Sequence, residues 1–126
     1  MFIMFDRIFV DRVQETIIDY SGGSHGILNS GAIDSALTSP VASFSGVELY
    51  DTDLKKCCKL FHALVTNHGY VDGNKRIGLY MFFVSLEICG VDYSKLTQDY
   101  AVDTTLKIAS GNLSVDELIE EMGGLF

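Results

Sequence analysis

The segment from Asn74 to about Cys89 constrains the fold more than any other part of the chain. Its apolar side chains leave no polar face, because they recur at Ile77, Leu79, Tyr80, Met81, Phe82, Phe83, Val84, Leu86 and Ile88. A helix that is apolar on every side is buried among other helices. The run is shorter than the roughly 20 residues that a membrane span needs, and it contains Glu87. We therefore expect the central helix of a bundle.

Amphipathic patterns on both sides of this segment predict the helices that cover it. We expect them over Asp6–Tyr20, Ser30–Thr38, Asp51–Asn67, Ser94–Ser110, and from Ser114 to a stop at Gly123–Gly124. Asp51 is expected to cap the third of these helices, and Ser114 with Glu117 is expected to form a capping box at the start of the last. In the first of these, the residues at helical spacing are Ile8, Phe9, Arg12, Val13, Thr16, Ile17 and Tyr20. Residues 41–50 are strand-like, and Gly46 in their middle predicts a short hairpin-like flap. The sequence thus predicts one all-α domain over residues 1–126, a bundle of about six helices.

The net negative charge of the chain argues against some classes of binding partner. The 126 residues carry 17 acidic and 9 basic side chains, a formal net charge of −8, and 48% of them are apolar. An acidic chain with a full core is not expected to coat nucleic acid or an anionic membrane. Residues 1–10 lack the basic start of a secretory signal, and Cys57, Cys58 and Cys89 lie among apolar residues. We expect a cytoplasmic protein with reduced thiols.

One short segment concentrates the polar chemistry of the chain. Between two apolar helices stands the run His68-Gly69-Tyr70-Val71-Asp72-Gly73-Asn74-Lys75-Arg76. Its end opens the most apolar helix, whose first backbone N–H groups lack intrahelical acceptors and attract anions. Glycine at position 73 admits a phosphate close to the backbone, while Lys75 and Arg76 add positive charge. These features predict an anion-binding site.

The remaining polar groups of this run point to group transfer. The Asp72 carboxylate would repel a bare phosphate, but it suits a Mg²⁺ ion that also binds phosphate oxygens. The His68 imidazole is a suitable acceptor for a hydroxyl proton. A base, a metal ligand and phosphate-binding cations together predict phosphoryl or nucleotidyl transfer. The plainer alternative is a histidine at a helix end, an ordinary Asp-Gly-Asn turn and a solvated Lys-Arg pair.

The nine residues HGYVDGNKR resemble the motif of the Fic/Doc family, commonly HxFx(D/E)GN(G/K)R. The resemblance extends to Gly22-Gly23, Gly26-Ile27, Asp34–Leu37, Pro40 and Phe44–Tyr50, which are similar to the death-on-curing branch. It covers most of the chain, from about residue 5 to residue 120. The resemblance implies an all-α Fic fold and an enzyme that uses Mg²⁺ and a nucleoside triphosphate, ATP, to modify a protein hydroxyl.

The resemblance also implies a role for each matching residue. His68 would be the general base on the target hydroxyl, and Asp72 would hold the metal ion. The nucleotide phosphates would be bound by Gly73, Asn74, Lys75 and Arg76. The last two of these would also be catalytic, because they stabilise the charge that develops during transfer.

Two positions bear on the type of reaction. The adenylyl-transferring branch typically has a second glycine where this chain has Lys75, and a second arginine where it has Leu79. Both departures match the death-on-curing branch, which resembles a kinase that transfers the γ-phosphoryl group to elongation factor Tu and arrests bacterial growth. We therefore favour a Doc-like protein kinase. The alternatives are a Fic-type adenylyltransferase and a catalytically silent Fic-fold binding module.

Three residues depart from the pattern of the family. Gly69 stands where proline is common and would loosen the loop, Tyr70 replaces phenylalanine and would need a partner for its hydroxyl, and Leu28 stands where the branch often has arginine. No glutamate follows a serine or threonine at the four-residue spacing of the family's own inhibitory helix. The resemblance therefore implies restraint by a Phd-like antitoxin supplied in trans.

Overall fold

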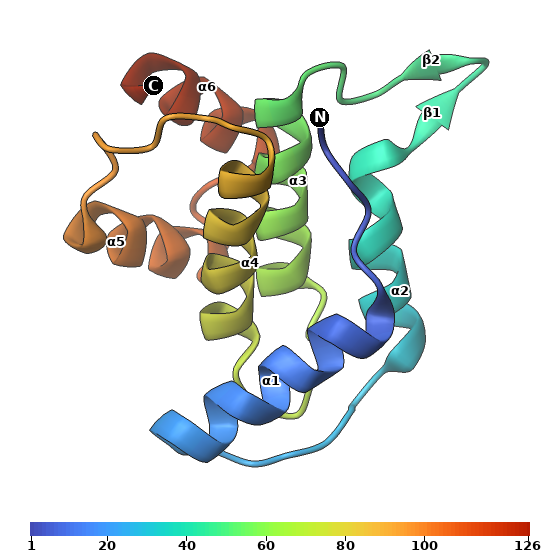
Figure 1. The fold of residues 1–126 in the computed structure, drawn as a ribbon, viewed down its shortest axis with the longest axis vertical. Helices are drawn as coiled ribbons and strands as arrows, with labels where there is room; N and C mark the ends of the chain where they lie inside the picture. Colours follow the sequence, from blue (N-terminus) through green and yellow to red (C-terminus); the bar gives the residue numbers. More distant parts are fainter.

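The computed structural model describes all residues, 1–126, as six α-helices with one small hairpin (Figure 1). The helices are α1 (Arg7–Ser21), α2 (Ser30–Thr38), α3 (Asp53–Thr66), α4 (Asn74–Ile88), α5 (Gln98–Ala109) and α6 (Val115–Leu125). Between α2 and α3 lie a 3-10 helix, η1 (Ser39–Val41), and two antiparallel strands, β1 (Ser43–Phe44) and β2 (Val47–Glu48). The expected all-α class, the number of helices and the hairpin near residues 41–50 are confirmed.

The centre of the bundle is the pair α3–α4, so the prediction that α4 alone is central is right only in part. Helix α3 contacts α2, η1, α4, α5 and α6, whereas α4 contacts α3, α5 and α1 and leaves Tyr80 and Ile88 48% and 44% exposed. The fully buried side chains of α4 include Ile77, Met81, Phe82 and Leu86. Phe82 stacks on Phe61 of α3 with ring centroids 4.7 Å apart. The two helices approach closely at Gly78, where a Cβ would lie 2.5 Å from the Val65 side chain. The α3–α4 pair is thus a closely packed support for the loop that joins it.

The buried face of α1 differs from the expected one. Its buried residues are Val10, Gln14 and Ile18. Ile8, Phe9 and Tyr20, which were expected on the inner face, are 66%, 44% and 93% exposed. The expected face is right only in part: Val13 and Ile17 pack against the core, but the fully buried stripe is centred on a polar residue, Gln14, which apolar periodicity does not detect.

Side-chain caps fix where the helices begin. The capping oxygens belong to Asp6 for α1, Asn29 for α2, Thr52 for α3 and Thr97 for α5. The expected cap Asp51 is wrong by one residue, since its carboxylate instead pairs with Lys55 at 2.9 Å. The expected start of α5 at Ser94 is also wrong, because the cap at Thr97 delays the helix to Gln98.

The last helix confirms one expectation and corrects another. The predicted capping box is present, with Glu117 N–H donating to Ser114 Oγ at 3.1 Å and Ser114 N–H donating to Glu117 Oε1 at 3.0 Å. Gly123 and Gly124 do not end α6, which continues to Leu125. A glycine stop needs a left-handed conformation, and neither glycine has a positive φ angle.

The hairpin lies at the opposite end of α3 from the polar loop (Figure 1). Helix α3 leads from the hairpin to the loop, and its 14 residues span about 21 Å. The hairpin side chains Phe44 and Val47 are 76% and 67% exposed. Buried Lys56 fixes the base of the hairpin through ion pairing with Glu48 at 3.2 Å and a hydrogen bond to the Tyr50 carbonyl. The hairpin therefore does not line the polar loop.

The three thiols are free, and each packs in or against the apolar core. Cys57 and Cys58 are fully buried, and the Cys57 and Cys89 sulfurs lie 3.8 Å apart. Burial raises the pKa of the Cys57 thiol to about 12, so this thiol is protonated and unreactive at neutral pH. None of the six helices combines the length and the apolar character required to cross a membrane.

Candidate functional site

The loop between α3 and α4 surrounds a cavity of about 350 Å³. The lining residues are Val65, His68, Val71, Asp72, Gly73, Asn74, Lys75, Arg76 and Ala109. All six residues predicted from the sequence as site residues are therefore brought around one space. Ala109, at the end of α5, contributes a wall that the sequence did not indicate.

The N-terminus of α4 opens into this cavity. Gly73 precedes the helix with a φ of +82°, a left-handed conformation that favours glycine. No side chain caps this end of α4, whereas a side chain caps each of the other five α-helices. Its first backbone N–H groups are therefore available to an anion, and the helix dipole adds partial positive charge.

The Asn74 side chain holds the loop in shape. Its Oδ1 accepts the Tyr70 N–H at 3.1 Å, and its Nδ2 donates to the Tyr70 carbonyl at 2.9 Å. Both groups of the amide are thus engaged inside the loop. An anion in the cavity would meet the backbone N–H of Asn74 rather than its side chain.

The side chains of the two neighbouring cations, Lys75 and Arg76, differ in how firmly the rest of the chain holds them. Arg76 Nη1 donates to Ser21 Oγ at 2.7 Å and to the Gly22 carbonyl at 2.8 Å, which fixes the guanidinium against the end of α1. Its Nη2 lies 3.6 Å from Asp72 Oδ1. Lys75 is exposed and takes part in no ion pair within the chain. Arg76 is therefore a fixed positive group, whereas Lys75 is free to reach a ligand.

The Asp72 carboxylate faces the cavity in its ionised form. Its Oδ2 accepts the Ser24 N–H at 3.2 Å, and its Oδ1 accepts the Gly73 N–H at 2.8 Å. These two hydrogen bonds, with a smaller contribution from the charge of Arg76, hold the pKa of the carboxyl below its ordinary value. The side chain remains 46% exposed, so both oxygens retain access to a cation.

A Mg²⁺ ion fits this site only in company with a nucleotide. No group of three or more His, Cys, Asp or Glu side chains surrounds Asp72 or any other point of the chain. Mg²⁺ is often bound by one or two carboxylates together with substrate phosphates and water. A single ionised carboxylate beside an anion-binding helix end fits that mode of binding.

His68 opens the loop in an uncommon backbone conformation. Its φ is +50°, which few residues other than glycine adopt and which is concentrated at functional sites. The side chain is exposed and lines the cavity. It is engaged in none of the side-chain hydrogen bonds that fix the rest of the loop. The imidazole is therefore available to a hydroxyl group that enters the cavity.

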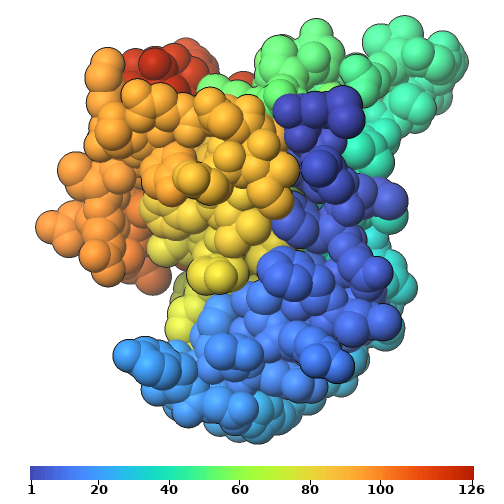
Figure 2. Space-filling view, viewed as in Figure 1, coloured from blue at the N-terminus to red at the C-terminus, as the bar shows by residue number.

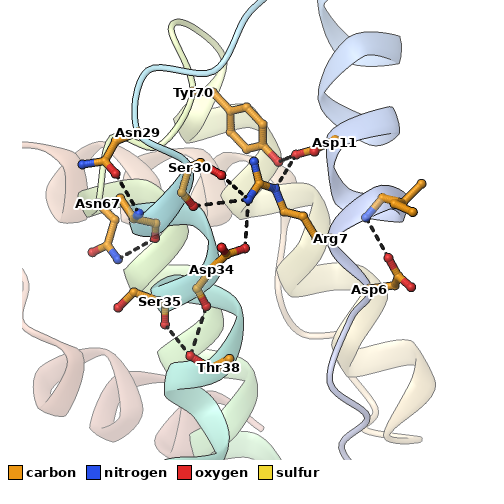
Figure 3. A network of polar contacts seen from close by, with 12 residues as sticks. Asp6, Arg7, Asp11, Asn29, Ser30, Asp34, Ser35, Thr38, Asn67 and Tyr70 are labelled. Carbon is orange, nitrogen blue, oxygen red and sulfur yellow. Dashed lines mark hydrogen bonds and ion pairs between the residues drawn. The ribbon is translucent and has the colours of Figure 1, made fainter.

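The hydroxyl of Tyr70 has the partner that its burial requires. The residue is 2% exposed, and its hydroxyl donates to Asp11 Oδ1 of α1 at 2.6 Å (Figure 3). Burial and the neighbouring Asp11 carboxylate raise the pKa of the Tyr70 hydroxyl, so it acts only as a donor here. The ring thus anchors the loop in the core, and Asp11 supplies the one hydrogen-bond acceptor that its buried hydroxyl needs.

The expectation that Gly69 loosens the loop is wrong. Its carbonyl accepts two hydrogen bonds at 2.9 Å, from the N–H groups of Leu28 and Asn29. A Cβ at position 69 would overlap the Ile33 side chain, so glycine lets the loop pack directly on α2. Leu28 itself is 67% exposed and supports the loop through its backbone.

Gly23 allows the chain after α1 to pass close to the charged groups of the site. Its φ is +119°, and a Cβ there would lie 2.7 Å from Asp72 Oδ2 and 3.1 Å from Arg76 Nη2. We expect Gly23→Ala to cost about 1–3 kcal/mol of stability through backbone strain. It should also displace the Asp72 carboxylate, and so weaken binding of the Mg²⁺–nucleotide complex that the resemblance to the Fic/Doc motif implies. Thermal unfolding and calorimetric titration measure the two effects.

Gly46→Ala is the matched control for this substitution. Gly46 has a φ of +79° and lies in the hairpin, outside the cavity, and no atom lies within 4 Å of the position of its missing Cβ. Both substitutions therefore strain the backbone, but only Gly23→Ala places a Cβ against the charged groups of the site. We expect weakened binding in Gly23→Ala alone, and equal binding by both variants would contradict a role of the close approach.

An apolar groove of about 530 Å³ adjoins the cavity through Arg76. The groove is formed by α1, α4, α5 and the segment before α5, with Ile17, Ser21, Arg76, Leu79, Tyr80, Phe83, Leu96, Gln98, Ala101 and Val102. Figure 2 shows the surface hollowed between the end of α1 (blue) and α5 (orange). Leu79 lines this groove. It lies about one helical turn after Arg76, so this position adds apolar surface to the groove rather than a second cation beside Arg76.

Comparisons with known proteins agree with the resemblance of the loop. Residues 5–86 match the family model described as the Fic/DOC family, and this range includes the whole α3–α4 loop. The chain is 31% identical over 104 residues to "Toxin Doc" of Mycolicibacterium smegmatis (strain ATCC 700084 / mc(2)155). The aligned region covers 82% of this chain and 80% of that protein.

Proposed function

Because the chain belongs to the Fic/Doc family, we propose that it is a Doc-like toxin that transfers a group from ATP to a protein hydroxyl. One observation carries the proposal: a single cavity is lined by an imidazole, an ionised carboxylate, two cations and an uncapped helix N-terminus. Transfer from a nucleoside triphosphate requires these groups, namely a base, a metal ligand, and cations and N–H groups that bind phosphate oxygens.

In the proposed reaction the nucleotide phosphates lie over the N-terminus of α4. Backbone N–H groups from Asn74 onward donate to phosphate oxygens, the fixed guanidinium of Arg76 meets the charge that develops, and Lys75 moves onto the phosphates. Asp72 would hold Mg²⁺, which neutralises phosphate charge when it is bound. The target hydroxyl gives its proton to His68 as its oxygen bonds to the γ-phosphorus. The bond from that phosphorus to the bridging oxygen breaks, and ADP leaves.

We propose phosphoryl transfer rather than adenylyl transfer. Support comes from two positions near the phosphates, Lys75 and Leu79, which depart from the adenylyl-transferring pattern. Lys75 lines the cavity, and Leu79 faces the apolar groove, so the distal phosphate would meet one fixed arginine rather than two. The alternatives are a Fic-type adenylyltransferase and a catalytically silent binding module. The resemblance suggests a translation factor similar to elongation factor Tu as substrate, with growth arrest as the result.

ATP labelled at either the γ or the α phosphate distinguishes these alternatives. Purified protein is incubated with Mg²⁺, labelled ATP and a bacterial lysate, and transfer to protein is followed with and without a chelator. We expect transfer of the γ label only, and loss of transfer when Mg²⁺ is removed. Transfer of the α label would show that the protein is an adenylyltransferase and not a kinase. Transfer of neither label would favour the silent binding module.

We propose that a Phd-like antitoxin restrains the toxin by covering the apolar groove. The groove shares Arg76 with the cavity, so a helix with an apolar face and an acidic side chain would fill the groove and meet this guanidinium. The antitoxin is proposed because of the similarity to a protein named "Toxin Doc". Expression of the chain alone is expected to arrest growth, and a co-expressed partner should bind it and relieve the arrest. Harmless expression alone would contradict this part of the proposal.

A further inference from the structure

Two side chains on the inner face of α1, Asp11 and Gln14, bind the polar loop directly. Asp11 Oδ1 accepts the hydroxyl of Tyr70 at 2.6 Å, and Gln14 Nε2 donates to the backbone carbonyl of Asp72 at 3.2 Å. Residues three apart on a helix share one side of it, so the two contacts form a single row. This row meets the loop on both sides of its residue 71.

The Asp11 end of the row is fixed by further contacts within the bundle. Arg7, one turn earlier on α1, donates from Nε to the same Asp11 oxygen at 2.9 Å (Figure 3). Its Nη1 donates to Asp34 Oδ1 at 2.8 Å and to Ser30 Oγ at 2.9 Å, both on α2. Helix α2 begins beside Asn29, whose N–H donates to the Gly69 carbonyl. The loop is thus held between α1 and α2.

The burial of Gln14 is costly unless its amide is used. Gln14 is 3% exposed, between the buried apolar residues Val10 and Ile18, and its hydrogen bond joins it to the Asp72 carbonyl. Burying an amide in an apolar environment carries a penalty that an apolar side chain of similar size would avoid. The bond holds the backbone of the residue whose carboxylate faces the cavity.

We propose that Asp11 and Gln14, here called the α1 clamp, are positioning residues that set the place of Asp72 in the transfer site. The inference rests on the proposed function. The clamp residues lie outside the cavity and act through the loop backbone and the Tyr70 ring. Their effect follows from the precision that transfer requires, because partners in the outer shell of a metal ligand typically change metal affinity about 10–100-fold.

The test compares three variants of the full chain. Gln14→Leu replaces the amide by an apolar side chain of similar size. Tyr70→Phe removes only the hydroxyl that donates a hydrogen bond to Asp11. Tyr70→Phe restores the residue usual in the family, so it is expected to fold. Glu15→Gln is the matched control, because Glu15 is exposed on the same helix.

Two readouts that need no turnover report on the clamp. The first is hydrogen exchange of the Val71 amide, which donates to the Gly26 carbonyl at 3.0 Å and lies between the two clamped residues. The second is the Mg²⁺ concentration needed for half-maximal binding of a non-hydrolysable ATP analogue. We expect Gln14→Leu to speed the exchange about tenfold and to raise the Mg²⁺ requirement about tenfold. Tyr70→Phe should speed the exchange, and Glu15→Gln should change neither readout.

Unchanged exchange in both clamp variants would overturn the inference. Faster exchange with an unchanged Mg²⁺ requirement would also overturn it, because the residues would then stabilise the loop without positioning Asp72. Failure of the proposed function looks different. In that case the wild-type chain transfers no label from ATP, while the exchange and Mg²⁺ comparisons still decide whether the clamp positions the loop.

Discussion

Replacing His68 by alanine is expected to lower the rate of transfer from ATP by about 10²–10⁴-fold, the usual contribution of a general base. His68 lines the cavity, is exposed and is engaged in none of the hydrogen bonds that hold the loop, so the fold should not depend on its imidazole. The proposed toxin should lose growth arrest together with transfer. Initial rates with labelled ATP, and growth after induced expression, measure the two effects.

His25→Ala is the matched control for this substitution. Its imidazole is also exposed, but it pairs with Asp19 at 2.7 Å and lies outside the cavity. We expect His25→Ala to retain both transfer and growth arrest. If His68→Ala still arrests growth, the chemistry at this site is not the cause, and the silent binding module becomes the better account.

Arg76→Ala is expected to lower the transfer rate by about 10²–10³-fold, the effect of removing one fixed donor to developing charge. Its guanidinium is held by Ser21 and Gly22 before any ligand binds, so it costs little reorganisation during the reaction. Arg76→Lys keeps the charge but loses the planar fork, and we expect it to restore only a small part of the rate. The rate at saturating nucleotide is the quantity to compare.

Lys75→Ala is the natural comparison, because it removes the adjacent cation. Lys75 is exposed and has no ion-pair partner, so its charge must be brought to the phosphates from a mobile side chain. We expect a loss of about tenfold, smaller than for the fixed donor. Equal losses in the two variants would contradict the distinction between a fixed and a mobile cation.

Much of the fold can be predicted because local patterns determine it. The all-round apolar character of residues 74–89 correctly predicts that α4 belongs to the core of the bundle, and Ser30–Thr38 is a helix with the bounds expected. The errors occur where tertiary structure selects among local signals. Thr97 is used as the cap of α5 although Ser94 is also available, and Gly123–Gly124 remain helical because nothing forces them into a left-handed conformation.

The candidate site can be predicted only as far as it is contiguous in sequence. Seven of the nine lining residues lie within nine consecutive positions, and one motif indicates six of these seven as functional. The residues that hold the loop are far away along the chain, since Gln14 precedes Asp72 by 58 positions and Asp11 precedes Tyr70 by 59. Their contacts depend on how α1 packs, and periodicity predicts its inner face only in part because Gln14 is polar. Only the structure reveals them.

The masses of the proteins in a bacterial lysate treated with this protein, Mg²⁺ and ATP give the most direct test of phosphoryl transfer by the α3–α4 loop. We expect one protein to gain the mass of a phosphoryl group on a Thr, Ser or Tyr side chain, and to gain nothing when His68→Ala replaces the wild-type chain. A gain of the mass of AMP would contradict phosphoryl transfer. No gain with the folded wild-type chain would contradict group transfer by this site altogether.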